Sequence, residues 1–270
     1  MVQNYEGFKE VMLTDEDMAE FYSNMHDNKL GCLTNEYLII KNIQHEIKDY
    51  CKWDGDEYVR VASKQIRNDW LGKVKARNPQ QVCAIDMLLD LDITVKALTG
   101  KAGSGKSLLM INAAVDLVKK HKFNKIVYIR NNIELAGVSK LGALPGNAYD
   151  KLEPFYAGLS DHLGDALMFA DIFEFVHLGY MRGRDIRDSI IMVNEAENLT
   201  SSHIGLLLSR VAEGSQLWLD GDIKQVDLKM FENDNGLKAL DRLYGNKLFA
   251  TIKLQTCERS DTAKLADLFN

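Results

Sequence analysis

The sequence predicts an α/β protein whose main domain is a parallel sheet with helices on both faces, preceded by a small β-rich module. From residue 76 onward, short apolar runs typical of strands alternate with segments whose apolar residues recur at helical spacing. Such alternation gives a parallel sheet, because each crossover between strands passes through a helix. Before residue 76, the strand-like runs 36–40 and 57–61 are separated by a turn-forming stretch. We therefore predict two domains, residues 1–75 and 76–270.

Composition is that of an ordinary globular protein. The 270 residues are 46% hydrophobic and 27% charged, and no apolar run approaches the roughly 20 residues that a membrane span needs. The N-terminus lacks the pattern of a signal peptide, and the four cysteines are far apart, without a C-x-x-C pair. We expect free thiols and a cytoplasmic location, with no membrane partner. The net charge of −6 means that any nucleic-acid contact needs a local basic patch.

The expected elements follow from periodicity and capping residues. Thr14 and Asp17 have the spacing of a capping box, and Pro79 stands near the first position of a second helix. Strands of the main domain are expected over 92–98, 125–129, 174–177, 190–193, 216–219 and 248–254. Helices are expected after residue 107 and over 148–170, 201–211 and 236–243.

Residues 100–107 match G-x-x-x-x-G-K-[ST] at every fixed position. A β-branched run precedes the match and a helical pattern follows it, which a chance glycine-rich turn seldom has. The loop backbone and the helix N-terminus attract phosphate, the lysine adds a full charge, and the serine hydroxyl suits Mg²⁺. We therefore expect ATP and Mg²⁺ at this loop. The candidate binding residues are Gly100, Lys101, Ala102, Gly103, Ser104, Gly105, Lys106 and Ser107.

The second half of the site is expected at the end of the strand 190–193. Asn194 and Glu195 follow this apolar run directly. Glu195 is the candidate base that orients the attacking water, and Asn194 the candidate second support for Mg²⁺ beside Ser107. An amide at position 194 brings an oxygen but no charge. The alternative is that both residues simply end a strand.

Two later segments also have polar or charged residues after an apolar run, but the pattern is weaker. Gln225 follows the apolar run 216–219 by a short acidic turn, and it could report a γ-phosphate or belong to an ordinary turn. Arg259 follows the last strand, where it could contact phosphate or cap the surface.

Together these segments resemble the PhoH family, P-loop ATPases related to the first motor domain of superfamily-1 helicases. The resemblance runs from Asn78 to about Asp261, and it rests on the order of 78–81, 100–107, 141–146, 180–184, 194–200, 221–227 and 258–260. It implies a RecA-like P-loop NTPase fold and ATP hydrolysis. It further implies that Gln81 reads adenine, that Gln225 senses the γ-phosphate, and that Arg259 acts on it. The module containing residues 33–37 resembles the β-rich segment that precedes the ATPase in longer members.

The chain departs from the family pattern at two positions. Asn194 replaces the usual aspartate, and Glu197 replaces a glutamine. Either Glu197 restores the lost charge, or the protein binds ATP and hydrolyses it slowly.

The functional prediction is an ATPase acting on RNA or single-stranded DNA. Helicases place nucleotide between two motor domains, and the residues after Ser107 leave room for one, so we expect a homo-oligomer, a ring and possibly a hexamer, with an arginine shared between subunits. The alternatives are a nucleotide-gated assembly module and a small-molecule kinase with an arginine lid. Candidate basic groups are 119–125 and the loop residues Arg182, Arg184 and Arg187.

Overall fold

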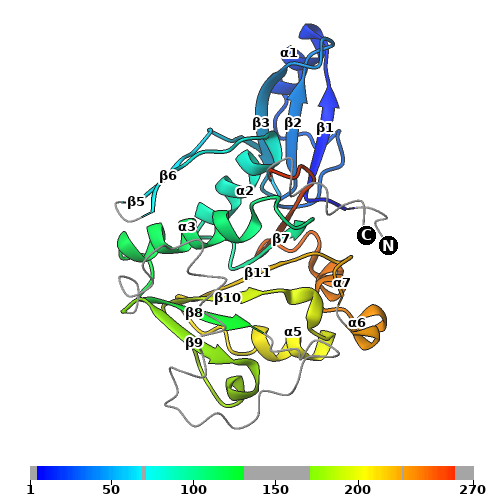
Figure 1. The fold of residues 1–270 in the computed structure, drawn as a ribbon. Helices are drawn as coiled ribbons and strands as arrows, with labels where there is room; N and C mark the ends of the chain where they lie inside the picture. Colours follow the sequence, from blue (N-terminus) through cyan, green and yellow to red (C-terminus); the bar gives the residue numbers. More distant parts are fainter. Residues whose placement is uncertain (1–4, 69–70, 131–170, 227, 259–270) are drawn as a thin grey trace.

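The computed structural model describes residues 5–68, 71–130, 171–226 and 228–258. Within these ranges a large sheet of six strands and a smaller sheet of four lie on opposite sides of helix α2 (Figure 1). A short hairpin, β5 (Ile66–Asn68) with β6 (Gly72–Val74), links the smaller sheet to α2.

The large sheet is parallel throughout. Its order is β12-β7-β11-β10-β8-β9, and each neighbouring pair runs in the same direction. The strands are β7 (Val95–Gly100), β8 (Lys125–Arg130), β9 (Phe173–His177), β10 (Ser189–Asn194), β11 (Gln216–Gly221) and β12 (Phe249–Leu254). Strand β11 lies between β7 and β10. The carboxyl ends of β10 and β11 are therefore close to the loop that follows β7.

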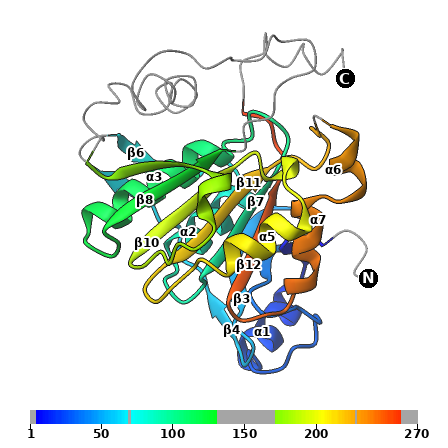
Figure 2. The same cartoon turned by 90° about the horizontal axis from the view of Figure 1, so that it is seen from below.

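Helices cover both faces of this sheet, as the sequence predicts (Figure 2). Alternate residues of β8 show the division: Ile126 and Tyr128 join the core under α2 and α3, whereas Val127 and Ile129 join the core under α5 and α7. The helices are α2 (Pro79–Leu89), α3 (Lys106–Lys119), α5 (Ser201–Leu208), α6 (Lys229–Asn233) and α7 (Gly236–Ala239). Three 3-10 turns accompany them, η2 (Leu178–Met181), η3 (Ala196–Asn198) and η4 (Leu240–Leu243). The P-loop NTPase fold is confirmed.

The N-terminal module is a sheet of order β1-β2-β3-β4 with helix α1 on its outer face. The elements are β1 (Phe8–Met12), α1 (Asp15–Ser23), β2 (Tyr37–Lys41), β3 (Ile47–Trp53) and β4 (Tyr58–Arg60). The capping box at Thr14 and Asp17 is present. Along β2, Tyr37 and Ile39 enter the core that contains α2, so the module shares its inner core with the main domain.

Several elements differ from the expectation, and their sequences explain why. Strands β1 and β3 were not predicted, because charged residues occupy most of their half-exposed positions and only strand pairing fixes them, β1 against β2 and β3 between β2 and β4. The predicted helix 236–243 is α7 followed by η4, and the predicted helix 201–211 ends at Leu208. The expected helix over 148–170 lies outside the described residues.

The described residues also bear on the cysteines and on membrane-spanning helices. All four cysteines are free thiols. Among the described residues, no helix combines the length and the apolar character that a bilayer span requires.

Candidate functional site

The loop between β7 and α3, residues 100–107, is named the phosphate loop here. Two of its glycines are required by geometry. Gly100 has φ +134°, and a Cβ there would collide with the carbonyl oxygen of Leu254 in the adjacent strand β12. Gly105 has φ +93° and precedes α3, where a side chain would press on Gln81. The loop can therefore keep its path only with glycine at these positions.

Helix α3 presents its N-terminus to this loop. The helix begins at Lys106, so its first backbone N–H groups and the positive end of its dipole face the loop. The Lys106 ammonium donates hydrogen bonds to the carbonyl oxygens of Gly100 at 2.6 Å and Lys101 at 3.0 Å. The lysine thus lies folded over the loop, within reach of an anion that the loop would bind.

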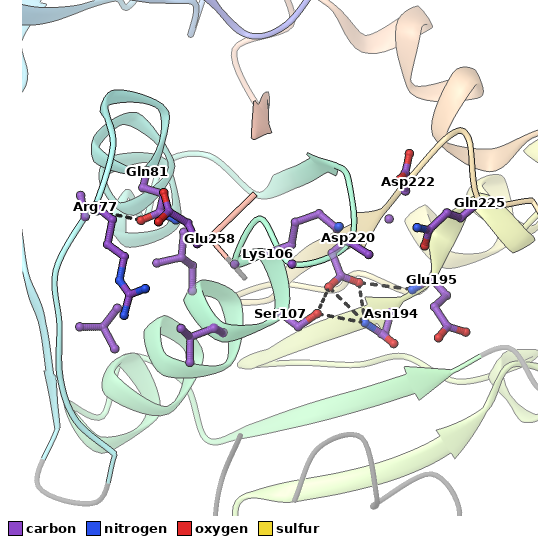
Figure 3. A pocket seen from close by; sticks show the side chains of 18 of the residues that line it. Arg77, Gln81, Lys106, Ser107, Asn194, Glu195, Asp220, Asp222, Gln225 and Glu258 are labelled. Atoms are coloured by element: carbon purple, nitrogen blue, oxygen red, sulfur yellow. Dashed lines mark hydrogen bonds between the residues drawn. The ribbon is translucent and has the colours of Figure 1, made fainter. Parts of the chain in front are cut away.

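Ser107, the last residue of the motif, contacts a carboxylate from β11. Its hydroxyl donates to Oδ2 of Asp220 at 2.7 Å (Figure 3). Asn194, at the end of β10, donates from its amide to both carboxylate oxygens of Asp220, at 2.9 and 3.1 Å, and lies 3.5 Å from the Ser107 hydroxyl. Strand register explains the cluster, because Leu219 pairs with Val193 and Asp220 pairs with Leu98.

Asp220 is buried, with 3% of its surface exposed. Burial raises the pKa of this carboxyl above its ordinary value, whereas the hydrogen bonds from Ser107 and Asn194 and the charge of Lys106 act in the opposite direction. Sequence reasoning did not assign Asp220 to the site. The available signal was a carboxylate directly after the apolar run Leu217–Leu219, and only strand order shows which loop it faces.

Glu195 lines the same pocket one residue after Asn194. Its backbone is left-handed, with φ +57° and ψ +47°, which costs about 1–3 kcal/mol for a residue with a side chain. Its N–H donates to Oδ1 of Asp220 at 3.3 Å. The strained turn therefore directs the chain out of β10 so that Glu195 lines the pocket, while its backbone N–H is bonded to the Asp220 carboxylate.

Glu197 behaves differently from its neighbours. It is 4% exposed, and its Oε2 has no hydrogen-bond partner. Burial, with the nearby charges of Asp220 and Glu195, raises the pKa of Glu197 to about 8. The carboxyl is therefore mainly protonated at neutral pH and adds little charge to the pocket.

The pocket itself has a volume of about 960 Å³ and extends across the phosphate loop. At one end lie Gln81, Arg77 and Glu258, and at the other Asp222 and Gln225 (Figure 3). The size falls at the upper end of the range of about 300–1,000 Å³ found for ligand pockets.

Gln81 is held by its neighbours at that first end. Its Nε2 donates to the carbonyl oxygen of Ser104 at 3.1 Å, and its Oε1 accepts the N–H of Arg77 at 2.9 Å. Asn78 caps α2 through the Gln81 N–H at 2.9 Å and donates to Oε1 of Glu258 at 2.8 Å. The backbone N–H of Glu258 in turn donates to Gly103 of the phosphate loop at 2.9 Å.

The remaining predicted residues are distributed unevenly. Gln225 lines the pocket on the exposed loop after β11, and Arg259 lies outside the described residues. Arg184 forms an ion pair with Glu174 at 2.6 Å. Arg187 pairs with Asp185. Among the described residues that line the pocket, the arginine is Arg77, at the Gln81 end.

A basic strip on the pocket wall was also missed by sequence reasoning. Lys73, Lys75 and Arg77 are exposed and line the pocket, and they alternate with Val74 and Ala76, which pack on the core. The predicted basic group 119–125 lies instead at the C-terminal end of α3, at the far edge of the sheet from the phosphate loop.

Comparison with known proteins identifies the family. The sequence profile described as PhoH-like protein matches residues 73–266. The chain belongs to the PhoH-like family. This PhoH-like chain is 30% identical to Protein PhoH2 of Bacillus subtilis over 97% of its own length and 63% of that protein. It is 32% identical to Protein PhoH2 of Mycolicibacterium smegmatis over 71% of its length and 46% of that protein.

The PhoH-like chain thus spans about half to two-thirds of the length of these curated relatives. Among solved structures, the Pif1 helicase of Candida albicans aligns with a TM-score of 0.41 and 16% identity, over 73% of this chain and 44% of that one. A Sulfolobus solfataricus SWI2/SNF2 ATPase core in complex with dsDNA aligns with a TM-score of 0.37 and 14% identity, over 72% and 46%.

Proposed function

We propose that this PhoH-like protein binds ATP with Mg²⁺ and hydrolyses it, in coupling with RNA or single-stranded DNA. The observation that carries the proposal is the meeting of Ser107, Asp220, Asn194 and Glu195 beside the phosphate loop. A phosphate-binding loop, a hydroxyl, a buried carboxylate and a second carboxylate at the pocket wall are the groups that phosphoryl transfer to water requires.

The phosphates would lie on the loop N–H groups and the N-terminus of α3. Lys106 would then exchange its bonds to the carbonyl oxygens of Gly100 and Lys101 for phosphate oxygens. Bound Mg²⁺ neutralises charge that develops on the phosphate oxygens. The donor set fits this ion, because Ser107 and the side chains beside it offer hard oxygen atoms. Among the residues that the structure describes, no group of three or more His, Cys, Asp or Glu forms a separate metal cage, which agrees with an ion held mainly by substrate and water.

Hydrolysis needs a group that orients and deprotonates water. Glu195 is at the pocket wall beside Asn194, and we assign it this role. Gln225 lines the pocket on the loop after β11, which supports the proposal that it responds to the γ-phosphate. At the opposite end, the fixed amide of Gln81 supports a role in base recognition.

Coupling with a polynucleotide rests on the resemblance to helicase motor domains and on the basic strip. Lys73, Lys75 and Arg77 place positive charge along one wall of the pocket, outside the phosphate loop itself.

A homo-oligomer is part of the same proposal. The loop arginines Arg182, Arg184 and Arg187 do not line the pocket that the described residues form. The phosphate end of the pocket would therefore take its arginine from Arg259 or from a neighbouring subunit.

The test is ATP turnover with and without RNA or single-stranded DNA. Glu195→Gln should lower turnover at least about 100-fold while ATP still binds, because it removes the base and keeps the shape. Lys106→Ala should weaken ATP binding itself. Glu213→Gln, a distant carboxyl after α5, is the matched control. Wild-type rates in both site variants would refute the assignment.

A second candidate is a nucleotide-gated assembly module that binds ATP and turns it over slowly. Asn194 favours it, because an amide replaces the carboxylate expected at the end of β10. ATP binding at micromolar concentration with negligible turnover, with or without polynucleotide, would support this candidate over the first. The small-molecule kinase gains no support, since Arg182, Arg184 and Arg187, proposed as its lid, do not line the pocket that the described residues form.

A further inference from the structure

Strand order gives the pocket a carboxylate that the sequence motif lacks. Because β11 lies between β7 and β10, the residue that ends its apolar core faces both the phosphate loop and Asn194. That residue is Asp220. Its side chain contacts both Ser107 and Asn194 (Figure 3).

We infer that Asp220, on β11, supplies the carboxylate of the Mg²⁺ site, and that Asn194 positions it. The charge expected at the end of β10 is therefore present on the neighbouring strand. This inference rests on the proposed function, since the ion in question is the one that accompanies ATP.

The first argument is the distance between the two oxygen donors. The Ser107 hydroxyl and Oδ2 of Asp220 are 2.7 Å apart. Mg²⁺ holds its ligands at about 2.0–2.1 Å in an octahedron, which places neighbouring ligands roughly 2.9 Å apart. The hydroxyl and the carboxylate thus already stand at nearly the separation that two adjacent ligands of one ion need.

The second argument is the direction of the Asn194 amide. A carboxylate only accepts hydrogen bonds, so the group of Asn194 that lies 2.9 and 3.1 Å from the two oxygens of Asp220 is its NH₂. The same NH₂ lies nearest the Ser107 hydroxyl, at 3.5 Å. Asn194 therefore turns its donor, and not its oxygen, toward the Ser107 side of the pocket. In this orientation the Asn194 amide fixes the position of the Asp220 carboxylate.

The third argument concerns the partners of Asp220. The groups that donate to it are a hydroxyl, an amide and the backbone N–H of Glu195, all neutral. These bonds fix the carboxylate without cancelling its charge. A buried carboxylate held in this way is arranged to receive a cation.

The experiment measures metal affinity directly, with Mn²⁺ as the probe for Mg²⁺. Free Mn²⁺ is followed by electron paramagnetic resonance in the presence of protein and a non-hydrolysable ATP analogue. Asp220→Asn should weaken Mn²⁺ binding at least tenfold. Exchanging the two residues, in the double variant Asn194→Asp with Asp220→Asn, should restore the affinity to within about threefold, because the carboxylate returns to the same cluster from β10.

Asp222→Asn is the matched control. Asp222 lies two residues further on, and its side chain accepts the N–H of Lys224 at 3.0 Å in its own turn. This variant should keep Mn²⁺ affinity within twofold. An equal loss in the Asp220 and Asp222 variants would show a general charge effect and overturn the inference, as would unchanged Mn²⁺ affinity in Asp220→Asn.

Binding of a fluorescent ATP analogue without metal separates this inference from the proposed function. Asp220→Asn should keep metal-free binding within a few-fold, which also shows that the variant is folded. If the wild-type protein bound no nucleotide, the proposed function would fail and this inference with it. If the wild type bound nucleotide and Mn²⁺, but Asp220→Asn bound Mn²⁺ as tightly as the wild type, only the assignment of Asp220 would fall.

Discussion

Asn35 joins the N-terminal sheet to the edge of the large sheet. Its side-chain amide donates to the carbonyl oxygens of Lys247 and Phe249, at 2.9 and 3.0 Å, across more than two hundred residues of sequence. The side chain is 5% exposed. A second link lies further along β12, where the N–H of Lys253 donates to the carbonyl oxygen of Glu6 at 2.9 Å. The N-terminal module is thus fixed to the strand that borders the phosphate loop.

Asn35→Ala should lower the free energy of unfolding by about 1–3 kcal/mol, because the carbonyl oxygens of Lys247 and Phe249 lose a donor. Chemical denaturation followed by circular dichroism measures the change. Asn24→Ala is the control, since the Asn24 side chain donates to the exposed carbonyl of Glu20 in α1, and this variant should change stability by less than about 0.5 kcal/mol. Equal effects of both variants would contradict the linking role of Asn35.

Lys96 is a buried lysine at the base of β7. It donates to the carbonyl oxygen of Leu88 and to Oε1 of Gln216, both at 2.9 Å, and lies over the ring of Trp218. Lys96→Met fills a similar volume but removes the donor to the carbonyl oxygen of Leu88, whereas Oε1 of Gln216 keeps the indole N–H of Trp218 at 2.9 Å. The free energy of unfolding should fall by about 1–3 kcal/mol. A variant as stable as the wild type would show that the carbonyl oxygen of Leu88 finds another partner.

The same lysine should make stability depend on pH. Burial lowers the pKa of Lys96 to about 7, whereas a lysine in the unfolded chain titrates near 10.4. Between these values the unfolded chain binds more protons, so the contribution of this group to stability rises with pH, by at most about 1.4 kcal/mol per pH unit. Denaturation at pH 7, 8 and 9 should show a flatter profile for Lys96→Met than for the wild type.

Gln81→Ala should reduce discrimination between ATP and GTP. Hydrogen bonds to Ser104 and Arg77 fix the orientation of the Gln81 amide. The donor hydrogen and the acceptor lone pair that these bonds leave unused therefore have a fixed direction. We expect affinity for ATP to fall about tenfold and affinity for GTP to change little, measured by titration with fluorescent analogues. A uniform loss for both nucleotides would indicate damage to the loop through Ser104 instead.

The basic strip should matter for polynucleotide and not for ATP alone. Lys73→Glu with Lys75→Glu should abolish stimulation of turnover by RNA or single-stranded DNA and flatten its dependence on salt. Basal turnover is measured in the same assay. Lys119→Glu with Lys122→Glu, at the far end of α3, provides a control with the same change of charge. If the control lost stimulation and the strip variant kept it, the polynucleotide path would lie at that far edge.

Turnover per subunit should depend on protein concentration. In the proposed homo-oligomer a shared arginine completes the site, and such arginines contribute about 10³–10⁵ in related reactions. Dilution through the dissociation range, followed by light scattering and ATP turnover together, checks this expectation. A monomer with full activity at every concentration would refute it.

The sequence was sufficient wherever the chemistry is local. The phosphate loop, its flanking strand and helix, and the capping box at Thr14 and Asp17 depend on residues a few positions apart, and the structure has the loop, strand, helix and cap as predicted. The position of Asp220 depends on which strands are neighbours, which periodicity does not encode. The same holds for β3, whose polar sequence becomes a strand only by pairing with β2 and β4. The hypothesis that Glu197 restores the charge lost at Asn194 did not take burial into account. Burial raises the pKa of Glu197 and leaves its carboxyl mainly neutral.

The place of β11 between β7 and β10 has a consequence for how such chains are classified. Two adjacent parallel strands end at the same edge of the sheet, so either strand can position an acidic side chain at the same site. A pattern that inspects only the last residue of β10 would label this chain a pseudoenzyme. Inspection of both strand ends would also find Asp220 on β11, the carboxylate proposed above for the metal, and it would separate chains that have such an acid from chains that lack it.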